Sequence, residues 1–168
     1  MESKVEVAKR QGRHLRGTIG ETLAAEATHF AEDDVSLLKF HGTYQQDDRD
    51  LRRAREAAGQ GKAYAFMVRV AVPAGAITAE QYLGLEEIAD EHGNHTLRVT
   101  TRQGFQFHGV LKGDLKATIA GVNQKLLTTI AVLGASPDHY SRSGRWSGTG
   151  KTECGLHTNS LELVRKEA

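Results

Sequence analysis

Residues 96–110 read TLRVTTRQGFQFHGV, and this stretch decides the fold class more than any other part of the chain. Successive side chains of a strand point to opposite faces. One face therefore carries most of the apolar groups. The other face carries polar groups at alternate positions, namely Arg98, Thr100, Arg102, Gln106 and His108. The pattern predicts a strand with one core face and one polar face.

The polar face has the chemistry of an anion-binding surface. The stretch contains no Asp or Glu, and both of its cations are Arg, whose planar fork suits bidentate capture of carboxylate or phosphate. At strand rise, Arg98 and Arg102 would lie about 13 Å apart. Gly104 indicates a bulge or the close approach of a ligand. The alternative is an edge strand whose polar face is only solvated.

The segments around this stretch predict alternating strands and helices. Residues 64–72 alternate as a strand and place Arg69 opposite the valines. Thr78 and Gln81 form a capping box that opens a helix to about residue 92. Its expected inner face is formed by Leu83, Ile88 and Ala89. Asp114 is expected to cap a second helix, whose apolar positions are Leu115, Ile119, Val122, Leu126 and Ile130.

This order predicts an α+β fold: a ferredoxin-like half-domain (strand-helix-strand-helix) with an N-terminal extension and a flexible C-terminal tail. The expected divisions are residues 1–62, 63–133 and 134–168. In the extension, residues 21–27 favour helix, 35–40 favour a short strand and 50–58 favour helix. Residues 135–159 are dense in Gly, Ser and Thr, which predicts a flexible segment before a possible short helix at 160–168.

Composition excludes several classes of protein. The 168 residues carry a formal net charge of +1 and interleave their basic and acidic residues, so neither nucleic acid nor a membrane is an expected partner. No secretory signal and no membrane-spanning run is recognised, so a cytoplasmic protein is expected. Residues 147–152 resemble a phosphate loop, but position 145 is Arg where that loop needs Gly.

The single cysteine limits the metal chemistry. Cys154 cannot form an intramolecular disulfide, and one thiol cannot make a multi-cysteine zinc site or hold a cubane iron–sulfur cluster. No residue of this chain is therefore predicted to bind a metal. Cys154 itself is interpreted as an exposed thiol.

Two runs carry a resemblance to a known family. RVTTRQGFQFHG at 98–109 resembles the siroheme-contacting strand of the siroheme-dependent nitrite and sulfite reductase hemoproteins. KFHGTYQQDDRDLR at 39–52 is similar to the N-terminal signature of the assimilatory sulfite reductase hemoproteins. Both occur in the family's order, and the resemblance extends from about residue 15 to 133.

The resemblance implies roles for individual residues. The family's siroheme contacts correspond here to Arg98, Thr100, Thr101, Arg102, Gln106 and His108. Arg69 corresponds to the arginine that binds the substrate anion; its alternative role is a cross-strand ion pair with an acid. His108 is not expected to bind iron, because the family's axial ligand is a cysteine shared with its 4Fe-4S cluster. The run from 41 to 52 is expected to brace the cofactor cavity.

The resemblance implies a fragment of a sulfite reductase hemoprotein, which reduces sulfite to sulfide by six electrons at siroheme. A flavoprotein reductase subunit or a ferredoxin would be the electron donor. With no cluster ligands and a partial siroheme site, the chain is expected to be inactive alone. The alternatives are a ferredoxin-nitrite reductase fragment and a noncatalytic tetrapyrrole-binding or docking module. The agreement stops abruptly near residue 133, as in a truncated or frame-disrupted gene product; a genuine short module is the other explanation.

Overall fold

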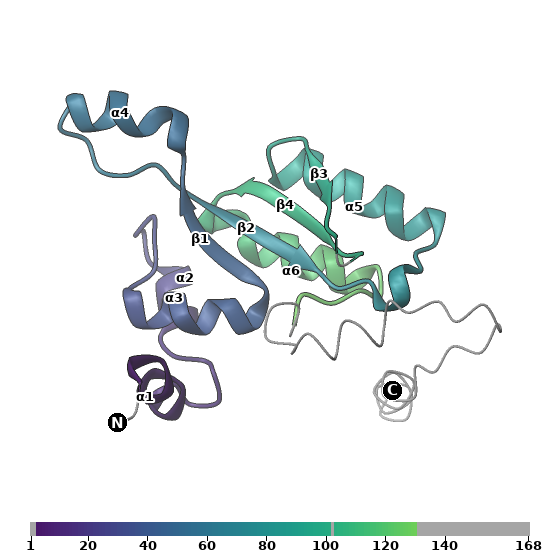
Figure 1. The fold of residues 1–168 in the computed structure, drawn as a ribbon, viewed down its shortest axis with the longest axis horizontal. Helices are drawn as coiled ribbons and strands as arrows, with labels where there is room; N and C mark the ends of the chain where they lie inside the picture. The colour runs from purple at the N-terminus through teal and green to yellow at the C-terminus, as the bar shows by residue number, and fades with distance from the viewer. Residues whose placement is uncertain (1–2, 102, 131–168) are drawn as a thin grey trace.

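The computed structural model describes residues 3–101 and 103–130, which are built around a four-stranded antiparallel sheet (Figure 1). The strand order is β1-β2-β4-β3. The strands are β1 (Thr43–Asp47), β2 (Tyr64–Val70), β3 (Leu97–Val99) and β4 (Phe105–Val110). The prediction of a ferredoxin-like α+β half-domain is confirmed.

Helices pack mainly on one face of this sheet. The two long ones are α5 (Ala79–His92) and α6 (Leu115–Gln124), which contact each other behind the sheet in Figure 1. The shorter helices, in chain order, are α1 (Lys4–Gln11), α2 (Ile19–Ala24), α3 (Glu32–Leu38), η1 (Lys39–His41), α4 (Arg49–Ala57), η2 (Pro73–Gly75) and η3 (Lys112–Asp114). Among the described residues, no helix has the length and apolar character to cross a membrane.

Strand β2 forms the centre of the core, as its alternation predicts. Phe66, Val68 and Val70 are fully buried toward the helices, whereas Arg69 lies on the opposite face and is half-buried. Phe105 and Phe107 of β4 pair with Val70 and Val68 and extend the same apolar surface. The alternation of apolar residues in these two strands therefore predicts correctly which side chains form the core.

Residues 96–110 form a hairpin instead of one continuous strand. The amide of Thr100 donates to the carbonyl of Gly104 (2.8 Å), and the amide of Gln103 donates to the carbonyl of Thr100 (2.9 Å). Gln103 has φ +62°, a left-handed conformation that closes the turn. The expectation of one continuous strand is therefore wrong, because the chain reverses between β3 and β4.

Two glycines in this hairpin have structural roles, one in strand packing and one in a β-bulge. A Cβ on Gly104 would lie 2.6 Å from the carbonyl oxygen of Val70, so Gly104 allows close approach of β2, where the sequence suggested a ligand. Gly109 has φ +74° and lies where the pairing of β2 and β4 shifts register. This bulge keeps Val110 on the buried face with Phe107 despite their odd spacing.

The capping box of α5 is confirmed: Thr78 accepts from the Gln81 amide, and the Gln81 side chain accepts from the Thr78 amide. The inner face differs from the prediction, because Leu83 is exposed and Leu85 is buried beside Ile88. Helix α6 ends at Gln124, and Leu126 and Ile130 are exposed. Asp114 stands at the N-cap of α6, but its side chain makes no capping hydrogen bond.

The N-terminal extension joins the same core. Residues 35–40, expected as a strand, lie in α3 and η1, because Val35 and Leu38, three positions apart, share one helical face that packs on the core. The strand of this region is instead β1, which pairs with β2. Phe30 packs edge-on against Phe66 with ring centroids 5.5 Å apart.

Buried Lys112 ties the extension to the half-domain. Its Nζ donates to the carbonyl of Thr22 at 2.7 Å and to the carbonyl of Ala25. These carbonyls lie at the C-terminal end of α2, where helix carbonyls lack partners within the helix and favour a cation. The predictions of a flexible segment at 135–159 and a short helix at 160–168 lie outside the described residues.

Candidate anion-binding face of the sheet

The register of three strands brings two arginines into one row. Arg69 of β2 is opposite Gln106 of β4, and Gln106 is in turn opposite Arg98 of β3. Cross-strand partners share a face of the sheet. All three side chains therefore project from the face opposite α5 and α6. His108, two residues along β4 from Gln106, lies on this face too.

Gln106 connects two of these side chains. With its amide oriented so that both ends are satisfied, Oε1 accepts from Arg69 Nε (2.9 Å) and Nη2 (3.3 Å). The amide nitrogen then donates to His108 Nε2 at 3.2 Å. A donor that points at Nε2 requires a neutral imidazole with its proton on Nδ1. The network orients Arg69 without neutralising its charge.

The environment of His108 favours that neutral form. Partial burial lowers the pKa of His108 below its ordinary value, and the positive charges of Arg98 and Arg69 lower it further. Nδ1 then remains a neutral hydrogen-bond donor near physiological pH. His108 can therefore contribute a hydrogen bond to an anion without adding another positive charge.

Tyr44 completes the surroundings of Arg69. The Arg69 guanidinium carbon lies 5.4 Å from the centroid of the Tyr44 ring, within the range of a cation–π contact. Tyr44 of β1 is paired with Met67 of β2. Met67 and Arg69 are two residues apart in β2 and share a face, so Tyr44 lies on the face of Arg69 as well. Sequence reasoning missed Tyr44 because it did not predict β1. Residues 43–47 read TYQQD, which has no apolar alternation that could have signalled this strand.

No carboxylate forms an ion pair with Arg69 or Arg98 within residues 3–101 and 103–130. Arg69 therefore makes no cross-strand ion pair, its alternative role, with any described residue, and its partners there are an amide and an aromatic ring. By contrast, Arg52 makes a bidentate pair with Asp47, at 2.7 and 2.8 Å. Within the described part of the chain, the sheet face thus carries two guanidiniums without acidic partners.

Two other site residues of the prediction, Thr100 and Thr101, lie at the turn. Thr100 Oγ1 accepts from the Gly104 amide at 3.1 Å, so this hydroxyl also stabilises the hairpin. Thr101 is exposed in the turn. Arg102 lies outside the described residues, as do Cys154 and the segment 147–152. The described residues contain no cluster of three His, Cys, Asp or Glu side chains that could hold a metal ion.

The acidic pair in the signature run has separate structural contacts. Asp48 caps α4 by accepting from the amides of Asp50 and Leu51, at 2.9 and 3.3 Å. Asp47 pairs with Arg52 as described above. The pKa of Asp47 is lowered, first by its hydrogen bond to Arg52. Neither carboxylate contributes to the row that contains Arg69 and Arg98.

Comparison with known proteins identifies the domain that carries this face. Residues 58–125 match the family described as the nitrite/sulfite reductase ferredoxin-like half domain. These residues form a nitrite/sulfite reductase ferredoxin-like half-domain. It contributes β2, β3 and β4, and therefore Arg69, Arg98 and Gln106.

The half-domain and its extension are also similar to curated proteins. The chain is 50% identical over 133 residues to the sulfite reductase [NADPH] hemoprotein beta-component of Anoxybacillus flavithermus, and 48% identical over 133 residues to that of Myxococcus xanthus. Each match covers 79% of this chain but only 23% and 24% of the relative. The chain thus spans about a quarter of the length of the curated relatives it matches.

A solved structure has the same fold. The Mycobacterium tuberculosis NirA protein superposes with a TM-score of 0.63, covering 78% of this chain and 25% of that protein. The sequence identity is 20%, so this likeness concerns the fold alone. It extends beyond the half-domain into the N-terminal extension.

Proposed function

We propose that this chain is an N-terminal fragment of a sulfite reductase hemoprotein and that its open sheet face supplies part of the siroheme and sulfite site. One observation carries the proposal: Arg69 and Arg98 flank Gln106 on one face, and neither has a carboxylate partner in the described part of the chain. The similarity to sulfite reductase hemoprotein beta-components supports the same assignment.

The side chains of this face fit a tetrapyrrole rich in carboxylates. Arg98 and Arg102 would bind carboxylates of siroheme, and charge-assisted contacts of this kind are the stronger hydrogen bonds of proteins. Neutral hydrogen bonds would come from Thr100, Thr101, Gln106 and His108. When bound, siroheme supplies the iron and the redox chemistry. The protein residues orient its periphery.

Arg69 would bind the substrate anion. Its Nε and Nη2 are held by Gln106 and its plane is near Tyr44, so the guanidinium is oriented before any anion arrives. The remaining N–H groups can donate to sulfite and stabilise negative charge that develops as oxygens leave. Pre-orientation reduces the entropy lost when the anion is bound.

Turnover would need groups from outside this chain. A 4Fe-4S cluster takes four thiolates, and the sequence contains one cysteine. The electron donor would be a flavoprotein reductase subunit, in line with the NADPH-dependent relatives, or a ferredoxin. We therefore propose that the chain binds the cofactor weakly and is inactive alone. The nitrite reductase assignment and the noncatalytic module are the alternatives.

Siroheme titration of the full chain tests the proposal. We expect the Soret band to shift on binding, and Arg98→Gln to weaken binding about tenfold through the loss of a charge-assisted contact. Arg53→Gln is the matched control, because Arg53 is an exposed cation on α4 away from the row. Equal siroheme affinities for the wild type and Arg98→Gln would contradict the proposal.

A further inference from the structure

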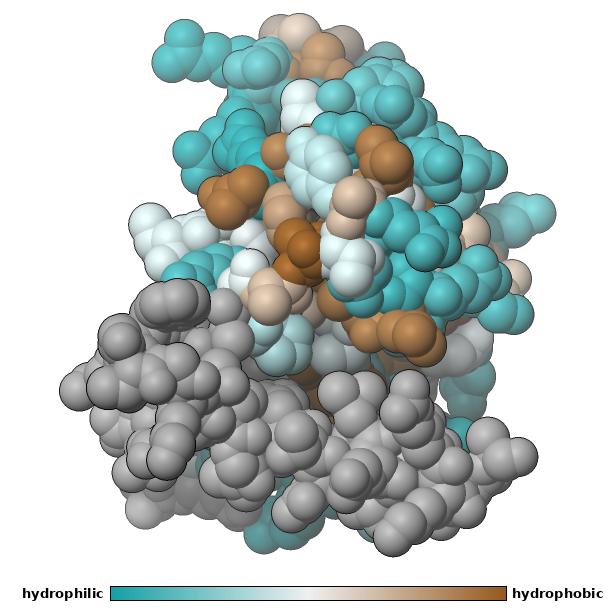
Figure 2. Space-filling view, turned by 90° about the vertical axis from the view of Figure 1, so that its right-hand side faces the viewer, coloured by the Kyte–Doolittle hydropathy of each residue, from teal (hydrophilic) through white to brown (hydrophobic). Residues whose placement is uncertain are grey.

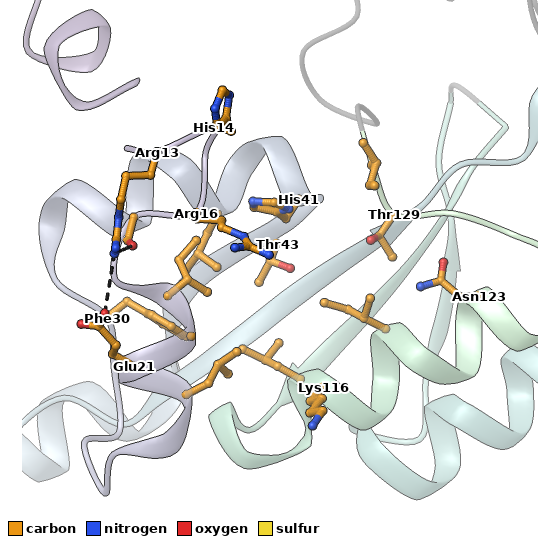
Figure 3. A pocket seen from close by; sticks show the side chains of 18 residues that line it. Arg13, His14, Arg16, Glu21, Phe30, His41, Thr43, Lys116, Asn123 and Thr129 are labelled. Atoms are coloured by element: carbon orange, nitrogen blue, oxygen red, sulfur yellow. Dashed lines mark hydrogen bonds and ion pairs between the residues drawn. The ribbon is translucent and has the colours of Figure 1, made fainter. Parts of the chain in front are cut away.

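A cavity lies on the other face of the sheet. It has a volume of about 1000 Å³ and lies between residues 13–23 of the N-terminal extension and helix α6 (Figure 3). Thr43 lines it and pairs with Val68, so its side chain shares the helix-covered face, opposite Arg69 and Tyr44. The cavity is therefore separate from the anion-binding face.

The lining of the cavity is amphipathic. Its apolar side chains include Ile19, Leu23, Phe30, Leu115 and Ile119. Figure 3 shows Arg16, His41 and Thr43 gathered on one wall, with Asn123 and Thr129 on the wall opposite. An apolar chamber with a few convergent polar groups is the usual form of a small-molecule site.

Thr43 has an unmet hydrogen-bonding requirement inside this cavity. The residue is 1% exposed, and its Oγ1 is the one buried side-chain oxygen or nitrogen without a partner among the described residues. A buried hydroxyl without a partner costs free energy. An oxygen of a bound molecule would supply the partner.

The charges at the cavity favour an anion. Glu21 lies 3.6 Å from Arg13, so the acid of the lining has a cation beside it. Arg16 has no carboxylate partner within the described chain. In Figure 3 its guanidinium points toward Thr43 and His41. One guanidinium and one hydroxyl match a single negative head group.

The backbone that presents Arg16 is strained. Arg13, His14 and Leu15 have φ of 46°, 61° and 66°, a run of left-handed conformations without glycine. His41 Nε2 contacts the Leu15 carbonyl at 3.0 Å, and Asp34 accepts from the Thr18 amide at 3.0 Å. Such strain persists where surrounding contacts hold it, and it is common at ligand sites.

We propose that this cavity binds a small amphipathic carboxylate. Its hydrocarbon body occupies the apolar floor, and its carboxylate accepts hydrogen bonds from Thr43 Oγ1 and the Arg16 guanidinium. Asn123 is placed to add a neutral hydrogen bond from the opposite wall. This function is independent of the proposed siroheme site, because Thr43 projects from the sheet face opposite Arg69 and Arg98.

Decanoate binding to the full chain, measured by isothermal titration calorimetry, tests the proposal. We expect Arg16→Gln and Thr43→Val each to weaken decanoate binding about tenfold. Thr43→Val should leave the unliganded stability unchanged or raise it, because the hydroxyl it removes has no partner. Decanol should bind more weakly than decanoate, and Arg98→Gln should bind decanoate as the wild type does.

Several results would overturn the proposal. These are no decanoate binding at millimolar concentration, decanol binding as tight as decanoate binding, or equal decanoate affinity in Thr43→Val and the wild type. Loss of decanoate binding in Arg98→Gln would place the anion on the opposite face. Arg16 is exposed, so Arg16→Gln should not disturb folding. This variant therefore tests the site even if Thr43→Val fails to fold. Siroheme titration remains a separate readout of the proposed function.

Discussion

Arg69 Nε lies 2.9 Å from the side-chain oxygen of Gln106, across the β2–β4 pair. This contact orients a cation without placing a counter-charge beside it. An acid at position 106 would pair with Arg69 and reduce its attraction for an external anion. The amide instead holds the guanidinium in position and leaves its charge available.

The first prediction concerns the titration of His108. Arg98→Gln should raise the pKa of His108 toward its ordinary value, because Arg98 contributes a charge that disfavours the imidazolium. NMR titration of the imidazole signals measures this pKa directly. Arg53→Gln, which changes an exposed cation on α4, is the control. An unchanged His108 pKa in Arg98→Gln would contradict the electrostatic account.

Stability should fall with acid partly through the same histidine. Because the pKa of His108 is lower in the folded state, the unfolded chain binds the proton more readily. The stabilising contribution is fully present above the ordinary pKa of about 6.5 and is lost as the pH falls through the lower, folded-state pKa. Urea unfolding at several pH values should show a shallower acid loss in His108→Gln. A steeper loss would show that the sign is wrong.

Gly104→Ala should destabilise the chain by about 1–3 kcal/mol. Its Cβ would lie 2.6 Å from the Val70 carbonyl oxygen, and backbone cannot yield as a flexible side chain does. Gly113→Ala is the matched control, since a Cβ there meets nothing within 4 Å. Urea unfolding of both variants measures the difference, and equal stability of the two variants would refute the role given to Gly104.

Lys112→Met should loosen the N-terminal extension. The substitution keeps the aliphatic stem but removes the Nζ donor from the carbonyls of Thr22 and Ala25, and the Thr22 carbonyl then keeps only the Ala25 amide at 3.2 Å. We expect the free energy of unfolding to fall by about 1–3 kcal/mol. Hydrogen exchange should then become faster in α2. Lys116→Met, at an exposed position of α6, is the control. Unchanged exchange in α2 would mean that the extension is held by other contacts.

The chain should produce no sulfide from sulfite with reduced methyl viologen, even after siroheme is added. The reason is the cysteine count, which leaves the siroheme iron without a cluster as electron donor. The control is a complete sulfite reductase under the same conditions. Sulfide formation above a protein-free control would remove this part of the proposed function.

Most of the fold could be predicted from the periodicity of apolar residues and from the helix-capping residues. Residues 64–72 and the capping box at Thr78 identify β2 and α5 because these signals are local. Residues 35–40 were assigned wrongly, because a short apolar run fits a strand or a helix equally well. The hairpin was missed because its alternation continues in phase through the turn. Only the hydrogen bonds between Thr100 and Gly104 distinguish the two arrangements.

The candidate site was predictable by residue type but not by arrangement. Spacing along the chain is enough to place Gln106 and His108 on one face, since they are two residues apart in the same strand. Arg98 shares that face because the β3–β4 register pairs it with Gln106. Arg69 and Tyr44 reach this face only in the folded sheet, because the pairing of β1, β2 and β4 connects residues far apart in the chain. The same pairing places Thr43 on the opposite face beside Val68, where its hydroxyl is buried with no hydrogen-bond partner among the described residues. Periodicity is a property of neighbours in the chain, whereas register is a property of the folded sheet.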